Sequence, residues 1–277
     1  MHISIRKKIA KDIRAKIGII IVVTFMLIAI LGPFFVKNPY NFSTSYLQPP
    51  NMEYIMGTND LGQDIFSRLI FGMRTSLLVA ISAGFLSTAI GAIIGTLSGY
   101  IGGIFDRVIM RVVDAFLVIP SIILIILVAA FINPGILTLI IMISIFHWQG
   151  GAKIIRGQTL ALKQKNHIIT AKTFGAKKLY VLLRHVIPDM GNILVVSFIY
   201  NSRSAIFLEA GLAFIGIANL TTISLGIIMH NAINFYYLPV WLWWLIPPGL
   251  VLSAILLSLT YIGTLLEKII DPRLRNA

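Results

Sequence analysis

The segment Ile17–Val36 reads IGIIIVVTFMLIAILGPFFV, twenty residues without a charged side chain. About 20 apolar residues in a helix cross the hydrocarbon core of a bilayer. Six Lys or Arg residues precede this segment. A cleaved signal peptide has a shorter apolar core and a small-residue cleavage site after it. No such site follows Val36, so we interpret Ile17–Val36 as a retained transmembrane helix.

Five more segments share this apolar composition, and together they predict an all-α integral membrane protein with six transmembrane helices. They are Ser76–Tyr100, Val108–Ile132, Pro134–Trp148, Asn192–Ile215 and Leu242–Leu266. The chain is 57% hydrophobic and 12% charged, whereas soluble domains carry about 25% charged residues. Glycines recur on the second segment at small-xxx-small spacing, which favours close helix packing. We place the protein in a cell membrane, as a multi-pass chain.

The distribution of Lys and Arg predicts the orientation. The tail 1–16 has six, the loop 150–189 has eight and the tail 267–277 has three, whereas the connections at 133–134 and 216–240 have none. Because basic loops stay in the cytoplasm, we expect both tails and loop 150–189 there and connection 37–75 outside. The net charge of +13 then reflects topology and contact with anionic membrane lipid. It does not indicate nucleic-acid binding, because no single basic, aromatic-laced face forms.

Loop 150–189 has an internal helical pattern. His167–Thr173 predicts a short helix that Gly175 ends. Lys177–His185 predicts a second helix with Leu179, Leu182, Leu183 and Val186 on an apolar face, and Pro188 separates it from the next span. Such a loop either lies on the membrane surface or docks into a cytoplasmic partner.

Glu209 is the most unusual carboxylate, because it falls inside the fifth predicted span. Burying its charge there costs roughly 2.5–3.5 kcal/mol or more unless it is paired, protonated or hydrated. It either lines a transport pathway or has a structural role, paired with Arg203 or capping the backbone near Gly211. In the third span, Arg111 and Asp114 are spaced to pair on one helix face, and Pro120 predicts a kink.

The end of connection 37–75 is rich in glycines and short polar residues, which predicts an ordered turn into the membrane. Ser67 is a candidate helix cap. Asp60 and Asp64 have the ligand type for calcium, but the full calcium-loop spacing is missing. The chain also lacks cysteine, a phosphate-binding loop, a His-Glu-x-x-His pair and a Gly-x-Ser-x-Gly elbow. We therefore predict that it is not an enzyme and holds no metal or cofactor of its own.

Five motifs, taken in order, resemble those of the C-type inner-membrane permease of ABC importers for dipeptides, oligopeptides and nickel. The external motif of that family, Gly-Thr-Asp-x-x-Gly-Arg-Asp-x-x-Ser-Arg-x-x-x-Gly-x-Arg-x-Ser, matches at Gly57, Thr58, Gly62, Asp64, Ser67, Arg68, Gly72, Arg74 and Ser76. It differs at Asn59 and Gln63. The next motif, Asp-x-x-x-Met-Arg-x-x-Asp-x-x-x-x-x-Pro, matches at Asp106, Met110, Arg111, Asp114 and Pro120.

The remaining motifs lie in the second half of the chain. The family's coupling loop, Glu-Ala-Ala-x-x-x-Gly followed by Ile/Leu-Pro, matches at Ala171, Gly175, Arg184, His185, Ile187 and Pro188. Ile169 and Thr170 stand where Glu and Ala are usual, so we expect Ile169 to contact a partner by apolar burial in place of a salt bridge. A later motif is present as Glu209, Ala210, Leu212, Phe214 and Gly216, and a C-terminal motif spans Asp271–Leu274.

The resemblance implies three groups of functional residues. The ATPase-coupling loop comprises Ile169, Thr170, Ala171, Phe174, Gly175, Lys177, Leu179, Arg184 and Pro188. The pathway or gating candidates are Glu209, Met110, Arg111, Asp114 and Pro120. The external motif comprises Gly57, Asp60, Gly62, Asp64, Ser67, Arg68 and Arg74.

The resemblance also implies an assembly. Its partners are a second, B-type permease, two ATP-binding subunits that hold ATP and Mg, and an extracytoplasmic substrate-binding protein. The substrate is a di- or oligopeptide, nickel or a metal chelate. Two alternatives remain: an autonomous secondary transporter that uses Glu209 for proton or ion coupling, and a membrane scaffold without transport. The absence of paired halves in the sequence argues against the secondary transporter.

Overall fold

The computed structural model describes residues 12–132, 135–217 and 222–270, and these residues form helices and loops without a β-strand. Four long helical stretches are apolar enough to cross a membrane, at Ile13–Phe34, Ile65–Ile101, Gly191–Phe214 and Trp241–Ile269. Two bent helix pairs raise the number of spans to six if each pair is one span. The predicted all-helical membrane fold is therefore confirmed. The C-terminal motif Asp271–Leu274 lies outside the described residues.

The helices occur in the following order along the chain. They are α2 (Ile13–Leu31) with the 3₁₀ turn η1 (Gly32–Phe34), α3 (Ile65–Ile101), α4 (Gly103–Val118), α5 (Ser121–Ile132), α6 (Ile136–Phe146), α7 (Gln149–Leu162), α8 (Asn166–Thr173), α9 (Lys178–Val181), the π-helix η2 (Leu182–Val186), α10 (Ile187–Asp189), α11 (Gly191–Phe214), α12 (Leu225–Ile233), α13 (Trp241–Trp244) and α14 (Ile246–Ile270).

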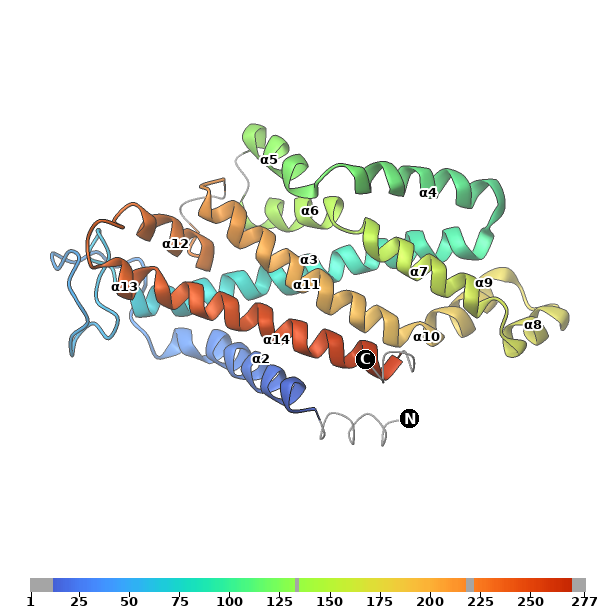
Figure 1. Cartoon of the computed structure of the whole chain (residues 1–277), viewed down its shortest axis with the longest axis horizontal. Helices are drawn as coiled ribbons and strands as arrows, with labels where there is room; N and C mark the ends of the chain where they lie inside the picture. Colours follow the sequence, from blue (N-terminus) through green and yellow to red (C-terminus); the bar gives the residue numbers. More distant parts are fainter. Residues whose placement is uncertain (1–11, 133–134, 218–221, 271–277) are drawn as a thin grey trace.

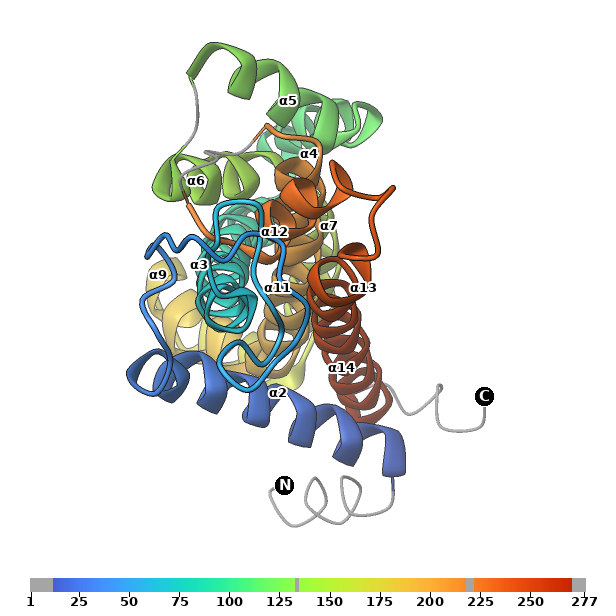
Figure 2. The same cartoon turned by 90° about the vertical axis from the view of Figure 1, so that its left-hand side faces the viewer.

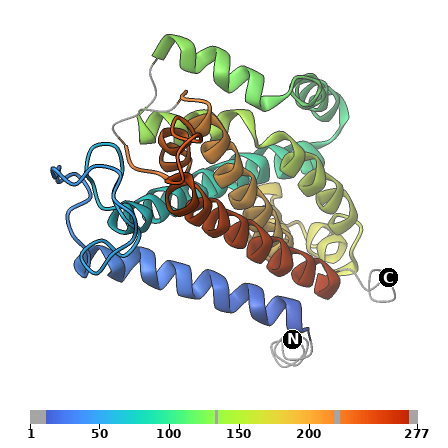
Figure 3. The ribbon, with the colours of Figure 1, turned by 60° about the vertical axis from the view of Figure 1, so that its left-hand side comes forward.

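The long helices lie side by side and define two ends of the molecule (Figure 1). Helices α8 to α10 lie at one end, which we call the α8 end, and α14 runs towards it. Segment 35–64, α12 and α13 lie at the other end. Viewed from that other end, α3 and α11 occupy the centre, with α2 and α14 along one side and α4 and α5 at the far side (Figure 2). Figure 3 shows α4 and α5 standing away from α2 and α14.

The second span begins at Ile65 and not at the predicted Ser76. Asp64 caps it, because its carboxylate accepts hydrogen bonds from the backbone N–H and the hydroxyl of Ser67. Asp64 therefore takes the capping role that we predicted for Ser67. An aspartate cap satisfies free N–H groups of the first turn. The helix therefore begins before the apolar segment and includes the polar motif residues from Ser67 to Arg74.

Two predicted spans are bent. Pro120 lies at a break of 79° between α4 and α5, which confirms the predicted kink. Ile119 before it is extended (φ −91°, ψ 122°), as expected of a residue that precedes proline. In the fourth predicted span, α6 ends at Phe146, and α7 follows after a bend of 46°. The first part of loop 150–189 is therefore helical as far as Leu162.

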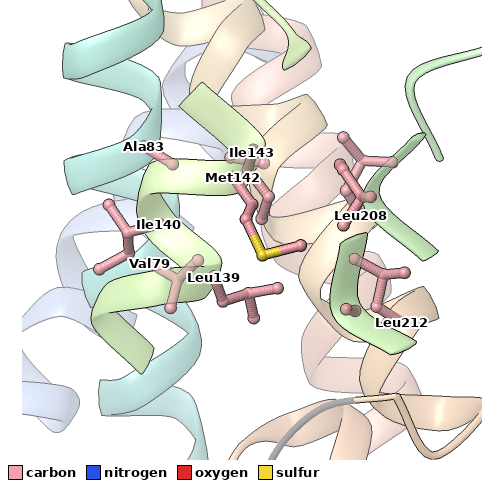
Figure 4. Close-up of a cluster of buried hydrophobic side chains, with 11 residues drawn as sticks. Val79, Ala83, Leu139, Ile140, Met142, Ile143, Leu208 and Leu212 are labelled. Carbon is pink, nitrogen blue, oxygen red and sulfur yellow. The ribbon is translucent and has the colours of Figure 1, made fainter. Parts of the chain in front are cut away.

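A buried apolar cluster joins α3, α5, α6 and α11. Val79 and Ala83 of α3, Ile143 of α6 and Leu212 of α11 are nearly inaccessible to solvent. Figure 4 shows the α6 side chains between α3 and α11, with Met142 among them. The short α6 is therefore held inside the bundle by burial of its side chains.

The glycines of α3 allow close approach of α7 and α11, as their spacing predicted. A Cβ atom on Gly95 would lie 2.4 Å from the carbonyl oxygen of Ala152, and one on Gly84 would lie 2.2 Å from Oγ of Ser202. Gly91 and Gly99 face the α7 backbone in the same way. Backbone contacts of this kind are typical of small-residue packing between membrane helices.

Gly95→Ala is expected to lower the stability of the protein by about 1–3 kcal/mol, the usual cost of overpacking. The added methyl group meets rigid α7 backbone, so the two helices must separate. Gly157→Ala is the matched control, because a Cβ there has no neighbour within 4 Å. Loss of a helical glycine at that site is expected to stabilise by about 0.5–1 kcal/mol. Thermal unfolding in detergent measures both, and equal effects would contradict the packing role of Gly95.

Candidate functional site

The segment 166–189 at the α8 end adopts two short helical parts. α8 ends at Thr173, and Gly175 has φ +82°, a left-handed conformation that favours glycine. This confirms the predicted helix end. The second part continues from α9 through η2 to α10, with Pro188 inside α10, and Met190 alone stands between α10 and α11. Pro188 therefore does not separate the loop from the next span, because proline is tolerated in a first helical turn.

A buried cluster fastens this segment to the long helices. Ile168, Val181 and Val186 have no exposed surface and pack with Tyr100 of α3 and Ile155 of α7. The side chains inside the cluster are thus shared between the segment and two spans. Movement of the segment must displace α3 and α7 with it, because close-packed interiors do not deform continuously.

Two lysines add polar contacts to the same attachment. Nζ of Lys163 donates a hydrogen bond to the carbonyl of Gly99 (3.0 Å). Nζ of Lys172 lies 5.1 Å from the ring centre of Tyr100, within the range of a cation–π contact. Burial, followed by repulsion from Lys172, lowers the pKa of Lys163 below its ordinary value.

The outer side of the segment is apolar and exposed. Its large side chains, which we call the exposed apolar surface, are Ile169, Phe174, Leu179, Tyr180 and Leu183. Phe174 is 85% exposed, which is costly for an aromatic ring outside a membrane or an interface. The prediction for the second helix was half wrong, because Leu182 and Val186 are buried whereas Leu179 and Leu183 face outward.

Polar and basic residues surround this surface. Ala171 is half-buried. The polar and basic residues around the exposed apolar surface are themselves exposed, and they are Thr170, Lys172, Lys177, Lys178 and Arg184. An apolar centre with a charged rim has the composition of a protein-docking site.

Two ion pairs connect α4 to α7, and we call them the α4–α7 clamp. Asp106 accepts two hydrogen bonds from Nε and Nη2 of Arg156 (both 2.6 Å) and one from the Ser98 hydroxyl. One carboxylate oxygen of Asp114 lies 2.7 Å from Nζ of Lys153. The predicted Arg111–Asp114 pair is therefore wrong in the described part of the chain, because Asp114 faces α7.

The other two motif residues on α4 differ in their surroundings. Met110 packs in a small buried cluster with Val113, Trp148 and Ala152. Arg111 is exposed. The motif spacing thus places Asp106, Met110 and Asp114 on one face of α4, since residues four apart lie on the same side of a helix.

Glu209 is buried in α11, with 2% of its surface exposed. The Ser76 hydroxyl donates to Oε2 of Glu209 (2.9 Å) and accepts from the Leu225 N–H (3.2 Å), the first residue of α12. Glu209 thus lies next to the N-terminus of α12, where a negative charge is favoured. No Glu209–Arg203 ion pair occurs among the described residues, and α11 continues past Gly211.

The external motif forms a hydrogen-bonded turn at the end opposite α8. Nδ2 of Asn59 donates to Oε1 of Gln63 (2.9 Å), and the Gln63 N–H donates to Oδ1 of Asn59 (2.7 Å). Oε1 of Gln63 also accepts from Nη1 of Arg68, a side chain that is only 6% exposed. The two departures from the family motif therefore contact each other.

The remaining residues of this motif support the turn or lie at its edge. Gly57 and Gly62 have φ values of +70° and +71°, so both positions favour glycine. Burial raises the pKa of Asp60. Arg74 is exposed on α3.

Gln63→Arg is expected to destabilise the protein by about 1–3 kcal/mol, because it removes the acceptor of the buried Arg68 and adds a second cation beside it. The double variant Asn59→Asp/Gln63→Arg is expected to recover most of this loss, since the new carboxylate faces both cations. A double-mutant cycle of thermal stability measures the coupling. Strictly additive effects of the two changes would contradict a direct contact between these side chains.

Comparison with known proteins identifies relatives along nearly the whole chain. The family described as "Binding-protein-dependent transport system inner membrane component" matches residues 87–276. The oligopeptide transport system permease protein OppC of Bacillus subtilis (strain 168) is 33% identical, over 95% of this chain and 86% of its own length. The dipeptide transport system permease protein DppC of the same organism is 29% identical, over 98% and 85%. OppC of Mycobacterium tuberculosis (strain ATCC 25618 / H37Rv) is 32% identical, over 86% and 84%.

Proposed function

The chain belongs to the family of inner-membrane components of binding-protein-dependent transport systems, as a C-type permease, and we propose that it forms half of the translocation pathway of an ATP-driven importer. Such permeases are multi-pass proteins of the bacterial cytoplasmic membrane, which agrees with its apolar helices. They are membrane components without catalytic activity. In our proposal the second half of the pathway is a B-type permease.

The observation that carries the proposal is the exposed apolar surface of segment 166–189. We assign the α8 end to the cytoplasm, because eight Lys and Arg residues occur in loop 150–189 and basic loops stay on the cytoplasmic side. In this position Ile169, Phe174 and Leu179 meet an ATP-binding subunit. Docking buries apolar area that is otherwise exposed, and the basic rim contributes to orientation more than to affinity.

Coupling follows from how the segment is attached. A displacement of α8 acts on Ile168 and Val181, which pack against Tyr100 and Ile155. The α4–α7 clamp carries the movement of α7 to α4, and the break at Pro120 lets α4 and α5 turn relative to each other. ATP closes the two ATPase subunits, and these helices then change the side from which the pathway is open. In this scheme ATP and Mg are held by the partners alone.

We propose a di- or oligopeptide as substrate. The names of the relatives describe oligopeptide and dipeptide transport. Nickel and metal chelates belong to the same proposal as wider alternatives. A substrate-binding protein on the outer side would deliver the substrate to the end where the external motif of residues 57–74 forms its turn.

Autonomous secondary transport through Glu209 is the competing proposal. A proton or ion carrier must exchange with water on both sides of the membrane, whereas Glu209 is 2% exposed and hydrogen-bonded to Ser76. These contacts are those of a residue that positions the start of α12. They favour the proposal of an importer subunit, in which Glu209 has a structural role and carries no proton or ion.

Affinity purification of this chain from its native membrane in mild detergent tests the proposal. We expect a second permease, one or two ATPases with phosphate-binding loops, and a binding protein to co-purify. Reconstituted vesicles should then take up peptide only with ATP and with all partners. Uptake by this chain alone that an uncoupler abolishes would establish the secondary transporter instead. Recovery of this chain alone, under conditions that preserve other membrane complexes, would contradict the importer.

A further inference from the structure

A cavity of about 380 Å³ lies between α11, α14 and the junction of α6 with α7. Figure 1 shows α11 running between α6 and α14. The residues around the cavity are His147, Arg203, Ser204, Phe207, Leu208, Leu256, Leu257 and Thr260. Phe207 and Leu257 are 62% and 55% exposed, so the cavity opens to the surface of the bundle. Its walls are apolar apart from a few polar groups, as is typical of binding pockets for small molecules.

Arg203 is the unusual member of this cavity. It lies roughly midway along the 24-residue α11, at the depth where a charged side chain is expensive. Its Nη1 donates to the hydroxyl of Thr260 (3.2 Å), and its guanidinium lies 5.4 Å from the ring centre of Tyr200. No carboxylate lies within ion-pair distance of Arg203 in residues 12–132, 135–217 and 222–270. Neutral contacts therefore hold a cation in place without neutralising it.

His147 supplies a second nitrogen-bearing group to the same cavity. It lies at the 46° bend between α6 and α7, and it is half-buried. A guanidinium offers two parallel N–H donors, which match the two oxygens of a carboxylate. An imidazole beside it donates or accepts one more hydrogen bond. The combination suits an anionic group attached to an apolar body.

We propose that this cavity binds the terminal carboxylate of the transported peptide during its passage, with Arg203 as the carboxylate-binding residue and His147 and Thr260 as positioning residues. This inference rests on the proposed function. All unmodified peptides carry a terminal carboxylate, whereas their side chains vary. A site for that group therefore serves substrates of different sequence, and the apolar walls accept the last side chain.

A peptide fits these observations better than the two other anionic partners. Phospholipid headgroups lie at the membrane surfaces, whereas Arg203 lies near the middle of the 24-residue α11. An acidic side chain of the second permease would neutralise Arg203, but it would leave most of a cavity of about 380 Å³ unfilled. The C-terminal end of a peptide supplies a carboxylate that neutralises Arg203 and a side chain that occupies the cavity.

Photo-crosslinking in the complete complex tests this proposal. The complex is placed in nanodiscs without the binding protein, so that recognition by that protein does not enter. The probe is a dipeptide with alanine first and a photoreactive leucine at the free C-terminus. We expect labels on Phe207, Leu208, Leu256 or Leu257, and unlabelled free-acid dipeptide should compete at least tenfold better than its C-terminal amide. Labelling of other sites, no labelling, or equal competition by acid and amide would overturn the proposal.

Three variants make the assignment specific. Arg203→Gln should reduce labelling at least tenfold, and Arg203→Lys should retain part of it. Leu257→Trp keeps the charge but fills the mouth of the cavity, so it should also abolish labelling. Arg107→Gln is the matched control, because Arg107 is exposed on α4 and does not line the cavity. Failure of Arg203→Gln alone to co-purify with the second permease would make Arg203 an interface residue and overturn the proposal.

The two levels of inference fail in different ways. If the wild-type complex shows no ATP-dependent peptide uptake, the proposed function is wrong. If uptake is normal and Arg203→Gln leaves both uptake and labelling unchanged, the importer stands and the carboxylate site is wrong.

Discussion

Phe174→Asp is expected to reduce ATP-driven uptake in the reconstituted complex by at least tenfold while leaving this chain folded. Burying a phenylalanine in an interface contributes about 2 kcal/mol, or roughly thirty-fold in affinity. The substituted carboxylate adds a desolvation cost on top of this loss. Since Phe174 is 85% exposed, the change removes little packing inside the chain. The measurements are uptake, ATPase stimulation by loaded binding protein, and co-purification of the ATPase subunits.

Gln164→Asp serves as the control for this prediction. Gln164 is exposed in the turn between α7 and α8, so the variant adds the same charge to the same loop but outside the exposed apolar surface. Unimpaired transport by Phe174→Asp would mean that segment 166–189 is not the docking site, and a membrane-surface role for the loop would take its place.

Asp106→Asn is expected to destabilise the protein by about 1.5–3 kcal/mol, the range for hydrogen bonds to charged groups, because the Asp106–Arg156 pair is partly buried. The side chain of Asp106 is 11% exposed and that of Arg156 is 30% exposed, so Arg156 would keep a charge that is only partly hydrated and has lost its partner. An amide offers Arg156 one neutral acceptor in place of two charged oxygens. The apparent melting temperature of the purified chain, followed by tryptophan fluorescence, should fall by several degrees.

Asp114→Asn is the matched control for the α4–α7 clamp. Asp114 and Lys153 are about half exposed, and exposed pairs contribute at most about 1 kcal/mol. The double variant Asp106→Asn/Arg156→Gln is expected to recover part of the loss, because it removes the unpaired charge. If both single variants had the same small effect, the bidentate pair would not be what holds α4 to α7.

Several features of this protein follow from local sequence. Apolar runs of about 20 residues require membrane helices, since only regular hydrogen-bonded structure satisfies the backbone in lipid. The bend at Pro120 and the helix end at Gly175 also follow, because proline removes an N–H and glycine readily adopts the φ of +82° found at Gly175. The small-residue spacing on α3 predicted close packing. The membrane helices, the bend and the helix end depend only on neighbouring residues, whereas the helices that pack on the α3 glycines come from elsewhere in the chain.

Other predictions failed where the partner of a side chain lies far away in sequence. Asp114 was paired with Arg111, its neighbour on the same helix, whereas the fold brings Lys153 of α7 to it. The helix start was placed at Ser76, because the polar motif from Ser67 to Arg74 concealed the cap at Asp64. Leu179 and Leu183 matched an apolar period, but the segment packs on α3 and α7 through Val181, Leu182 and Val186, which leaves Leu179 and Leu183 exposed. A signal for the Asp106–Arg156 pair existed in the two opposite charges, but nothing in the sequence brings α4 beside α7.

Local sequence was enough to predict the membrane-helical class, the bend at Pro120 and the positions of the family motifs, because hydrophobicity and backbone preference act within a few residues. Tertiary structure alone decided which charges pair, which apolar side chains remain exposed at the α8 end, and where the cavity around Arg203 opens. These depend on contacts between helices separated by tens of residues, and their energies exist only once the bundle has packed.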